Sequence, residues 1–379
     1  MTISELADLC GGTLLRGDPA RTADGVSIDS RTIKKNQLFL ALKGERFNGH
    51  DFAKTAIEGG AAGIVGQSRR LALLAEGACR SACLIEVDDP HAALHRLARG
   101  YRAKFDIPLV AVAGSCGKTT TKDMLAAILG QTKKIVATQG NLNNLIGAPL
   151  TLLRIGADTE AAVIEIASNA PGEIGRLAEI LSPTAGIITN IGPVHLEGFG
   201  DIEGVFEEKI SLLPHIGAGG FLAVHEEDVP PERIRSMYGG RIITFGLKQS
   251  ADFFATDIRQ DTDAGMKFLL NGKDPLRIPI LGRHNVLNAL AAIAAATQMG
   301  ADIDLIRAGL EKFPPSAMRM EVRELRGATI INDAYNANPR AMRESISTAV
   351  EAPAERRILA LGDMLELGEP ARAAHRSLG

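Results

Sequence analysis

Residues 109–121 read LVAVAGSCGKTTT, and this segment indicates how the middle of the chain folds. An apolar run of β-strand type leads into a glycine-rich turn, and residues 120–129 (TTKDMLAAIL) then have the pattern of a helix. A strand, a glycine-rich loop and a helix in this order are typical of α/β units that bind phosphate. We therefore expect a nucleotide-binding loop at residues 114–120.

This loop offers several groups to a nucleotide. Its backbone N–H groups and the start of the helix attract phosphate oxygens, Lys118 adds a positive charge for the β- and γ-phosphates, and Thr119 can bind Mg²⁺. Ordinary phosphate loops have glycine where this chain has Val112, so the loop is a variant. A plain glycine-rich turn would not need Lys118 and Thr119. The predicted ATP-binding loop comprises Gly114, Ser115, Cys116, Gly117, Lys118, Thr119 and Thr120, with a structural role for Cys116.

After the loop, apolar runs alternate with helical patterns along the chain. KIVAT (134–138), AAVIEIA (161–167) and GIITNI (186–191) are typical of buried strands, and GEIGRLAEIL (172–181) and VFEEKISLL (205–213) of helices. Short strands are expected between about 219 and 280, and then a long helix that ends at Gly300. Strands separated by helices indicate an α/β fold with a parallel sheet covered on both faces.

The chain is too long for one ordinary core, so two or three domains are expected from its length. The pattern of strands and helices divides it into residues 1–85, 86–314 and 315–379. The first has short strand signals at VSIDSR (26–31) and QLFLAL (37–42) and a helix at DFAKTAIEGGA (51–61). The third begins at a Pro-Pro linker and contains EVREL, ATIINDAY, a helix through AMRESISTAV and the apolar segment RILALGDM. About 65 residues are few for a doubly wound domain, so we expect that part of it is missing here.

Composition narrows the class of protein. The net charge of −3 gives no sign of binding to nucleic acid or to an anionic membrane. No apolar run is long enough to span a bilayer, and the N-terminus lacks the pattern of a signal peptide, so we expect a cytoplasmic protein. Cys10, Cys79, Cys83 and Cys116 do not form a zinc-binding pattern, and free thiols fit a reducing compartment.

Three polar residues lie near strand ends. Glu165 interrupts a buried strand, and either a Mg²⁺ ion or a solvent-facing strand end would satisfy its carboxylate; the sequence leaves these alternatives even. His195 follows another strand, where ligands bind in parallel sheets, but alone it would be a structural or surface residue. Lys209 alone would be a solvated lysine on a helix.

Longer stretches resemble the Mur ligase family, in the family's order. They are NLNNLIGAPLTLL (141–153), EIASNAPGEIG (165–175), TNIGPVHLEGFG (189–200), GRHNVLNAL (282–290), NDAYNANP (332–339) and LGDMLELGE (361–369). The N-terminal segment with IDSR and LFLALKGERFNGHDF is similar to the members that add D-alanyl-D-alanine. The resemblance covers essentially the whole chain, and YNANP and HLEGFG are its most specific motifs.

The resemblance implies a three-domain architecture, with an N-terminal UDP-substrate-binding domain, a central P-loop ATPase domain and a partial Rossmann-like C-terminal domain. It implies a monomeric ligase that uses ATP and two Mg²⁺ ions. The substrates would be UDP-N-acetylmuramoyl-tripeptide and D-alanyl-D-alanine, joined through an acyl phosphate for peptidoglycan synthesis.

The resemblance also assigns roles to individual residues. Thr119 and Glu165 would hold one Mg²⁺, and His195 would bind the second together with Glu165. Lys209 matches the lysine that CO₂ converts to a metal-binding carbamate, so the implied catalytic residues are Lys118, Glu165, His195 and Lys209. Further ATP contacts would be Asn285, Asn288, Arg319 and Asp333. Substrate contacts would be Ser30, Arg31, Asn143, Asn144, Ser168, Tyr335, Asn336 and Asn338, although capping, turn or packing roles would also explain such residues.

Two departures from the family pattern stand near the site. Ile166 and Ala167 replace a more usual Met-Gly pair, and Lys209 is not followed by glycine. Other amide ligases of the superfamily, such as folylpolyglutamate synthase, are an alternative that the choice of amine would separate. A P-loop phosphotransferase or switch would fit the loop without Glu165, His195 and Lys209, and a non-catalytic paralogue would not need to retain them.

Overall fold

The computed structural model describes residues 1–67, 70–71, 82–261 and 265–378 of the chain. Cys79 lies outside these residues. Contacts divide the chain into two compact units. The first comprises Met1–Asp106, Gln139–Ala157 and Glu179–Ser182, and the second comprises Ile107–Thr138, Asp158–Ala178 and Pro183–Gly379. The predicted domain boundaries at residues 85 and 314 stay predictions.

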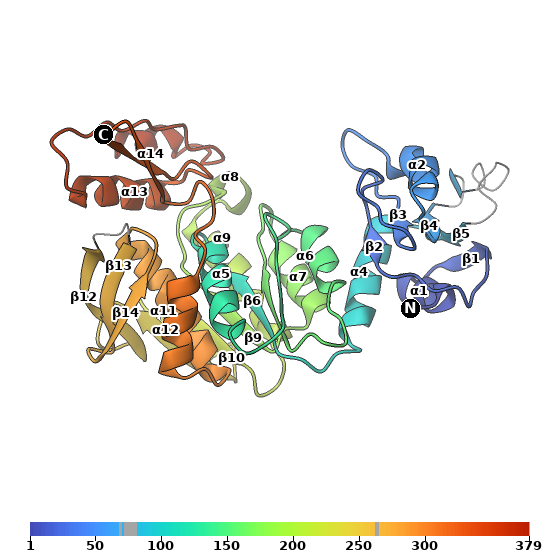
Figure 1. Cartoon of the computed structure of the whole chain (residues 1–379), viewed down its shortest axis with the longest axis horizontal. Coiled ribbons are helices and arrows are strands. Elements are labelled where there is room, and N and C mark those ends of the chain that lie inside the picture. Colours follow the sequence, from blue (N-terminus) through green and yellow to red (C-terminus); the bar gives the residue numbers. More distant parts are fainter. Residues whose placement is uncertain (68–69, 72–81, 262–264, 379) are drawn as a thin grey trace. The chain divides into compact units, whose positions relative to one another are not determined.

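The first unit is built on a five-stranded sheet of order β1-β5-β4-β3-β2, in which only β1 runs antiparallel to its neighbour. Side chains of β3 alternate between two cores, because Leu38 and Leu40 pack with α1 and α4 whereas Phe39 packs with α2. The elements are α1 (Ile3–Cys10), β1 (Thr13–Arg16), β2 (Val26–Ser27), β3 (Leu38–Leu40), the 3-10 turn η1 (Gly49–Phe52), α2 (Ala53–Glu58), β4 (Gly63–Gly66), β5 (Cys83–Glu86), α4 (Pro90–Arg102) and α6 (Gly147–Leu152) (Figure 1).

The second unit contains a nine-stranded sheet of order β14-β13-β12-β11-β10-β9-β6-β8-β7. Strands β6 to β12 all run parallel, and β13 and β14 extend the sheet as antiparallel strands. The elements up to the end of this sheet are β6 (Leu109–Ala113), α5 (Lys118–Leu129), β7 (Ile135–Ala137), β8 (Ala161–Glu165), α7 (Glu173–Leu181), β9 (Ala185–Ile188), α8 (Leu196–Phe199), α9 (Ile202–Ile210), the 3-10 turn η2 (Leu213–His215), β10 (Phe221–His225), α10 (Pro231–Arg235), β11 (Arg241–Gly246), β12 (Phe253–Asp261), β13 (Gly265–Leu270) and β14 (Asp274–Ile278).

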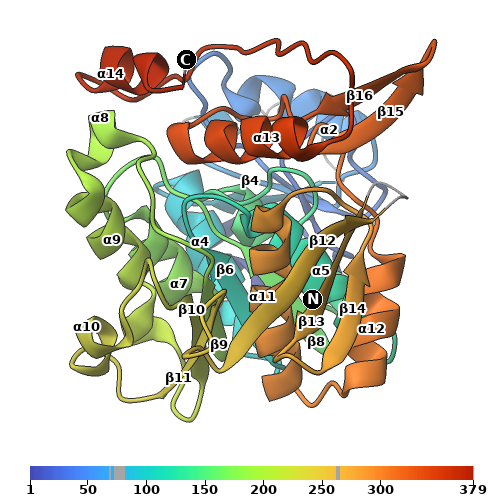
Figure 2. The same cartoon turned by 90° about the vertical axis from the view of Figure 1, so that its left-hand side faces the viewer.

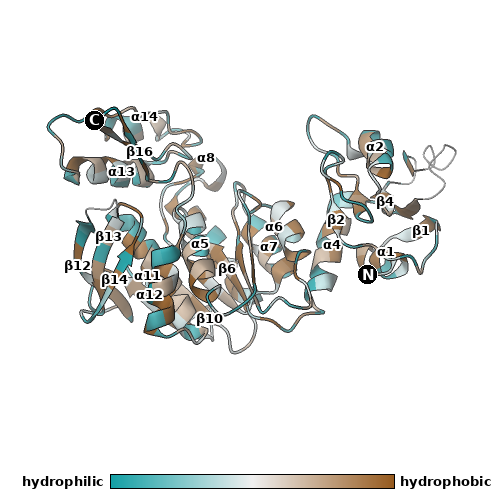
Figure 3. Ribbon diagram, in the orientation of Figure 1, coloured by the Kyte–Doolittle hydropathy of each residue, from teal (hydrophilic) through white to brown (hydrophobic). Residues whose placement is uncertain are grey.

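Helices cover both faces of this sheet. Figure 2 shows α5 on one side together with α11 (Arg283–Gln298) and α12 (Ile303–Lys312), and α7 and α9 on the other. The Ala-rich helix α11 packs closely on α5 and on β10 to β12, and its small side chains are almost all buried. The strands that this packing covers are apolar throughout, as the brown colour of β6 in Figure 3 shows. The predicted α/β fold with a buried parallel sheet is therefore confirmed.

The last part of the second unit contains a hairpin and two helices. These elements are β15 (Glu321–Leu325), β16 (Ala328–Asn332), α13 (Pro339–Glu351) and α14 (Ala371–Arg376). Strands β15 and β16 pair antiparallel, as EVREL and ATIIN would predict. The apolar segment RILALGDM (357–364) has no regular secondary structure, and Ile358 and Leu361 are 77% and 52% exposed. A strand needs a hydrogen-bonded neighbour, and the structure pairs β15 and β16 only with each other.

Candidate nucleotide and metal site

The glycine-rich loop lies where β6 ends and α5 begins, at the carboxyl ends of the parallel strands. Two of its glycines have positive φ and close neighbours. At Gly114 (φ 135°) a Cβ would lie 2.1 Å from Thr189 Oγ1, and at Gly117 (φ 78°) it would lie 2.0 Å from Asn288 Oδ1. Any larger residue would strain the backbone and collide, so these positions require glycine. Carboxyl ends of parallel strands are where α/β proteins bind ligands.

Residues just after β9 hold the loop in shape. Asn190 Oδ1 accepts a hydrogen bond from Cys116 N at 2.9 Å, and Thr189 Oγ1 donates to Cys116 O at 2.6 Å. Ser115 Oγ accepts from Gly192 N at 2.9 Å. Thr189 and Asn190 are not among the residues predicted from sequence for this site. A signal was present, since a polar Thr-Asn pair directly follows an apolar strand.

Thr119 and Glu165 form a pair of oxygen ligands beside the loop. Thr119 Oγ1 donates to Glu165 Oε2 at 2.8 Å, and Arg319 Nη2 donates to Thr119 Oγ1 at 3.0 Å. Glu165 is 2% exposed, and its N–H donates to Thr138 Oγ1 at 2.9 Å. Of the two alternatives for Glu165, the solvent-facing strand end is therefore wrong. A hydroxyl and a carboxylate in contact are ligands that suit Mg²⁺.

Lys118 is partly buried and points back at its own loop. Its Nζ donates to Gly114 O at 2.8 Å and to Ser115 O at 3.1 Å. Burial lowers the pKa of Lys118, and the nearby Glu165 carboxylate opposes this effect. An arriving phosphate would favour the charged amine in the same way, so the site is prepared for an anion.

Lys209 is buried, whereas its sequence alone predicts a solvated lysine on a helix. It is 2% exposed, and its Nζ donates to Ser168 Oγ at 2.9 Å and lies 5.3 Å from the centre of the Phe199 ring. Burial, and then the positive charge of Lys118, lower the pKa of Lys209 to about 7. A large fraction of the amine is therefore neutral near physiological pH, and the neutral form is the nucleophile that reacts with CO₂.

His195 is the N-cap residue just before α8, and its backbone is in the left-handed conformation, with φ 49°. Its Nδ1 contacts Glu366 Oε2, and its ring centre lies 6.4 Å from that of Phe199, the aromatic neighbour of Lys209. In the part of the chain that the structure describes, no group of three or more His, Cys, Asp and Glu side chains is placed to hold a metal. The side chains as they stand fit one Mg²⁺ at Thr119 and Glu165, and the second ion at His195 stays a prediction.

The two asparagines of GRHNVLN are buried and bonded to each other. Asn288 Nδ2 donates to Asn285 Oδ1 at 2.9 Å, and Asn285 Nδ2 donates to Leu281 O at 2.7 Å. Thr121 Oγ1 lies 3.4 Å from Asn288 O, to which it donates. These contacts connect α11 to α5 beside the phosphate loop. They describe a packing role, and contact with adenine stays a prediction.

Segments of the C-terminal part also meet the phosphate loop. The guanidinium carbon of Arg319 lies 3.9 Å from the centre of the Tyr335 ring, so Arg319 is held between this ring and Thr119. Asp333 accepts hydrogen bonds from Met320 N, at 3.1 Å, and from Ser345 Oγ. The roles of Asp333 and Tyr335 toward ATP and substrate stay predictions.

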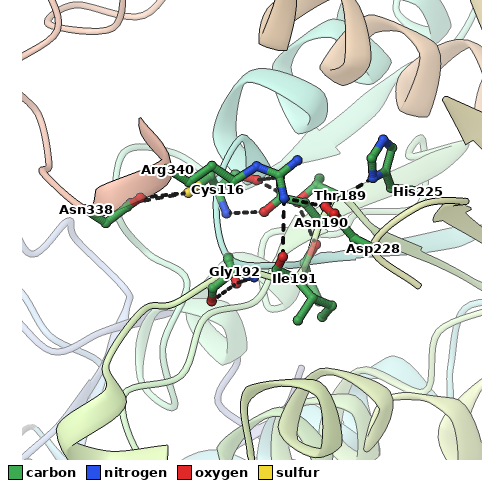
Figure 4. Close-up of polar contacts among 11 residues, drawn as sticks. Cys116, Thr189, Asn190, Ile191, Gly192, His225, Asp228, Asn338 and Arg340 are labelled. Carbon is green, nitrogen blue, oxygen red and sulfur yellow. Dashed lines mark hydrogen bonds and ion pairs between the residues drawn. The ribbon is translucent and has the colours of Figure 1, made fainter. Parts of the chain in front are cut away.

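YNANP forms a turn that leads into α13, as its composition alone would predict. Asn336 Oδ1 accepts from Ala337 N at 2.9 Å. Asn338 caps α13 by accepting from Ala341 N at 2.9 Å, and its Nδ2 lies 3.2 Å from Cys116 Sγ (Figure 4). Burial raises the pKa of the Cys116 thiol, so Cys116 is a structural contact of the loop, in keeping with its expected role.

The remaining predicted substrate residues belong to the first unit. Arg31 forms two hydrogen bonds to Asp29, at 2.9 and 2.7 Å, and its side chain is largely exposed; Ser30 is partly exposed between them. Asn144 Oδ1 accepts from the N–H groups of residues 146 and 147, at 3.1 and 2.9 Å, so it caps the start of α6. Asn143 is partly buried. None of these contacts tests a role in binding UDP or the muramoyl group.

A glycine-rich loop at the carboxyl ends of parallel strands, with Thr119 in contact with the buried Glu165 beside it, is typical of nucleotide-binding α/β domains. Family models divide the chain into three matching regions, and the chain belongs to the Mur ligase family. The models are "Mur ligase family, catalytic domain" at residues 22–102, "Mur ligase middle domain" at 112–296 and "Mur ligase, glutamate ligase domain" at 318–379.

Curated relatives and solved structures narrow the similarity to one branch of this family. UDP-N-acetylmuramoyl-tripeptide--D-alanyl-D-alanine ligase of Bacillus subtilis (strain 168) is 37% identical over 100% of this chain and 82% of the relative. The enzyme of that name from Escherichia coli (strain K12) is 36% identical, with 100% and 82% covered. The crystal structure of MurF from Acinetobacter baumannii matches with a TM-score of 0.90 at 31% identity, with the same coverage. MurF ligase from Thermotoga maritima in complex with ADP gives 0.82 at 27% identity, covering 94% and 81%.

Proposed function

We propose that this chain joins D-alanyl-D-alanine to UDP-N-acetylmuramoyl-tripeptide, with hydrolysis of ATP to ADP and phosphate, in the synthesis of peptidoglycan precursors. The observation that supports it most is the contact between Thr119 and the buried Glu165 beside the glycine-rich loop. The chain that carries it is similar, over all of its 379 residues, to UDP-N-acetylmuramoyl-tripeptide--D-alanyl-D-alanine ligase of Bacillus subtilis. The reaction belongs to the cytoplasm, where its nucleotide substrates occur. No helix in the described parts of the chain has both the length and the apolar character of a membrane span.

The chemistry requires activation of a carboxylate. The terminal carboxylate of the tripeptide attacks the γ-phosphorus of ATP, which forms an acyl phosphate and releases ADP. The amine of D-alanyl-D-alanine then attacks the acyl carbon, and phosphate leaves as the amide forms and the amine loses a proton. The attacking carboxylate and the phosphoryl group are both anionic, so nearby cations are needed to bring them together.

The residues of the second unit have separate tasks in this proposal. Lys118 binds the β- and γ-phosphates after leaving the carbonyl groups of its own loop. Thr119 and Glu165 would hold a Mg²⁺ ion, which would neutralise phosphate charge, and Arg319, which donates to Thr119 Oγ1, would contact the γ-phosphate. Asn285 would contact adenine.

The proposal also includes a second Mg²⁺ ion, with Lys209 and His195 among its ligands. Lys209, carbamylated by CO₂, would supply an anion, and His195 would join it after releasing Glu366. The neutral amine that carbamylation needs is supported by the burial of Lys209 and by the lowered pKa. Ser30 and Arg31 of the first unit would bind the uridine diphosphate group, and Asn143 and Asn144 the muramoyl group.

Phosphate release tests the proposal directly. ATP and Mg²⁺ are supplied with UDP-N-acetylmuramoyl-tripeptide and D-alanyl-D-alanine, first singly and then together, and release should require both. Phosphate release at the same rate with and without the muramoyl peptide would instead support a phosphotransferase. Faster release with a single amino acid than with D-alanyl-D-alanine would support another amide ligase. Lys118→Ala should abolish release while binding of the UDP substrate persists. Undiminished release in this variant would contradict the role of the loop.

A further inference from the structure

Arg340 has no role in the proposed reaction, yet it reaches the loops around the phosphate site. It is the residue after Pro339, in the first turn of α13. Its Nη1 donates to Ile191 O at 3.2 Å, and the same atom pairs with Asp228 Oδ2 (Figure 4). Its Cδ lies 3.6 Å from the place where a Cβ on Gly192 would stand, and that place is 3.9 Å from Ser115 Cβ. Arg340 therefore lies against the segment that shapes the phosphate loop.

The same oxygen, Asp228 Oδ2, also faces His225, which ends β10. His225 Nδ1 lies 3.1 Å from Asp228 Oδ2, and the side chains of His225 and Asp228 are 6% and 20% exposed. Burial alone would raise the pKa of Asp228, but His225 and Arg340 outweigh it and lower the pKa. The carboxylate is therefore charged at neutral pH and gives Arg340 a rigid partner. A partly buried ion pair with a second hydrogen bond holds its geometry better than an exposed pair does.

The position of Arg340 on α13 links this ion pair to the phosphate loop. Asn338, two residues earlier, caps the helix and contacts Cys116 in that loop. One turn of α13 thus makes two contacts with loops of the central sheet, one at Cys116 and one at Asp228 and Ile191. Because the turn is helical, its residues move together, and release of Arg340 would also loosen Asn338 from Cys116.

We propose that Arg340 is a positioning residue for nucleotide turnover. Through its contacts with Asp228 and the Ile191 carbonyl, Arg340 holds the start of α13 against the phosphate loop, and this set of contacts is called the seat below. The inference rests on the proposed function only in that nucleotide binds at this loop. It assigns no contact between Arg340 and the nucleotide. The seat is a property of the fold that can be measured without any muramoyl substrate.

The variants Arg340→Gln, Asp228→Asn and their double combination test the seat. Each single change should weaken ADP binding about tenfold, the loss expected for a hydrogen bond to a charged group. Because the two residues act as one pair, the double variant should be no weaker than either single variant. The control is Arg343→Gln on the same helix, whose arginine donates to Ser377 Oγ at 3.1 Å and should leave binding unchanged.

Alkylation of Cys116, followed by mass spectrometry of the peptide that contains it, gives a second readout. Loss of the Asn338 contact should raise the rate about tenfold in Arg340→Gln, whereas Arg340→Lys, which keeps the charge, should recover part of the protection. The proposal is overturned if Arg340→Gln and Arg343→Gln behave alike in both measurements, or if the two single effects add in the double variant. A parent protein that fails to bind ADP would count against the proposed function, and the alkylation rates would still test the seat.

Discussion

Gly117 offers a sharp test of how the phosphate loop is held. Its φ of 78° is unfavourable for an L-residue, which costs about 1–2 kcal/mol when alanine is introduced. The added Cβ would also lie 2.0 Å from Asn288 Oδ1, so the Asn288 side chain would have to leave its place. That movement would break its hydrogen bonds with Asn285 and Thr121, worth about 1 kcal/mol each. Gly117→Ala should therefore lower the free energy of unfolding by about 3–4 kcal/mol.

Gly219 provides a matched control, because its φ is 79° and no atom lies within 4 Å of the position of its Cβ. Gly219→Ala should cost only the backbone strain, about 1–2 kcal/mol. The free energies of unfolding of the two variants, measured in urea, should thus differ by about 2 kcal/mol. In an Asn288→Ala background, where these hydrogen bonds are already absent, the cost of Gly117→Ala should fall to about the 1–2 kcal/mol of backbone strain. Equal destabilisation by Gly117→Ala and Gly219→Ala would refute the argument that contact with α11 shapes the loop.

The other predictions concern charged and polar groups of the same unit. Because burial lowers the pKa of Lys209 to about 7, the neutral fraction rises with pH, and turnover in bicarbonate buffer should rise about tenfold from pH 6 to pH 8; a flat pH profile would contradict this. Glu208→Ala removes two hydrogen bonds, of 2.6 and 2.8 Å, to N–H groups at the start of α7, and urea unfolding should show a loss of about 2–4 kcal/mol, against less than about 0.5 for the exposed Glu207→Ala. Thr119→Val removes the hydroxyl that meets Glu165, and the Mg²⁺ concentration for half-maximal turnover should rise about tenfold; an unchanged Mg²⁺ titration would exclude Thr119 as a ligand.

Local patterns were enough to predict the sheet and the phosphate loop. An apolar strand, two glycines and a helix with Lys118 at its start are contiguous in sequence, and their geometry follows from backbone physics alone. The central strands were predictable for the same reason, since burial on both faces leaves a continuous apolar run. The helix at 283–298 also follows from its Ala-rich pattern and the glycine after it.

Contacts between distant segments were not predictable from such patterns. The burial of Lys209 depends on Ser168 and Phe199, and VFEEKISLL alone favours an exposed lysine beside glutamates. The choice for Glu165 was open because a strand pattern does not say which end of the sheet is covered. No sequence pattern predicts the role of Arg340, because its partner Asp228 is more than a hundred residues away. The pair forms only when α13 packs against the loop after β10.

The phosphate loop is therefore shaped by three segments before a nucleotide arrives. The residues after β9 bind its backbone, α11 fills the space beside Gly117, and α13 contacts Cys116. With the loop already in shape, the entropy of ordering it is lost on folding and does not weaken binding. On the proposed function, nucleotide binding would change the partners of Lys118 from these two carbonyl groups to phosphate oxygens. Since burial disfavours the charge on that amine, an anion relieves an existing electrostatic cost, and this differential interaction favours phosphate over water in the site.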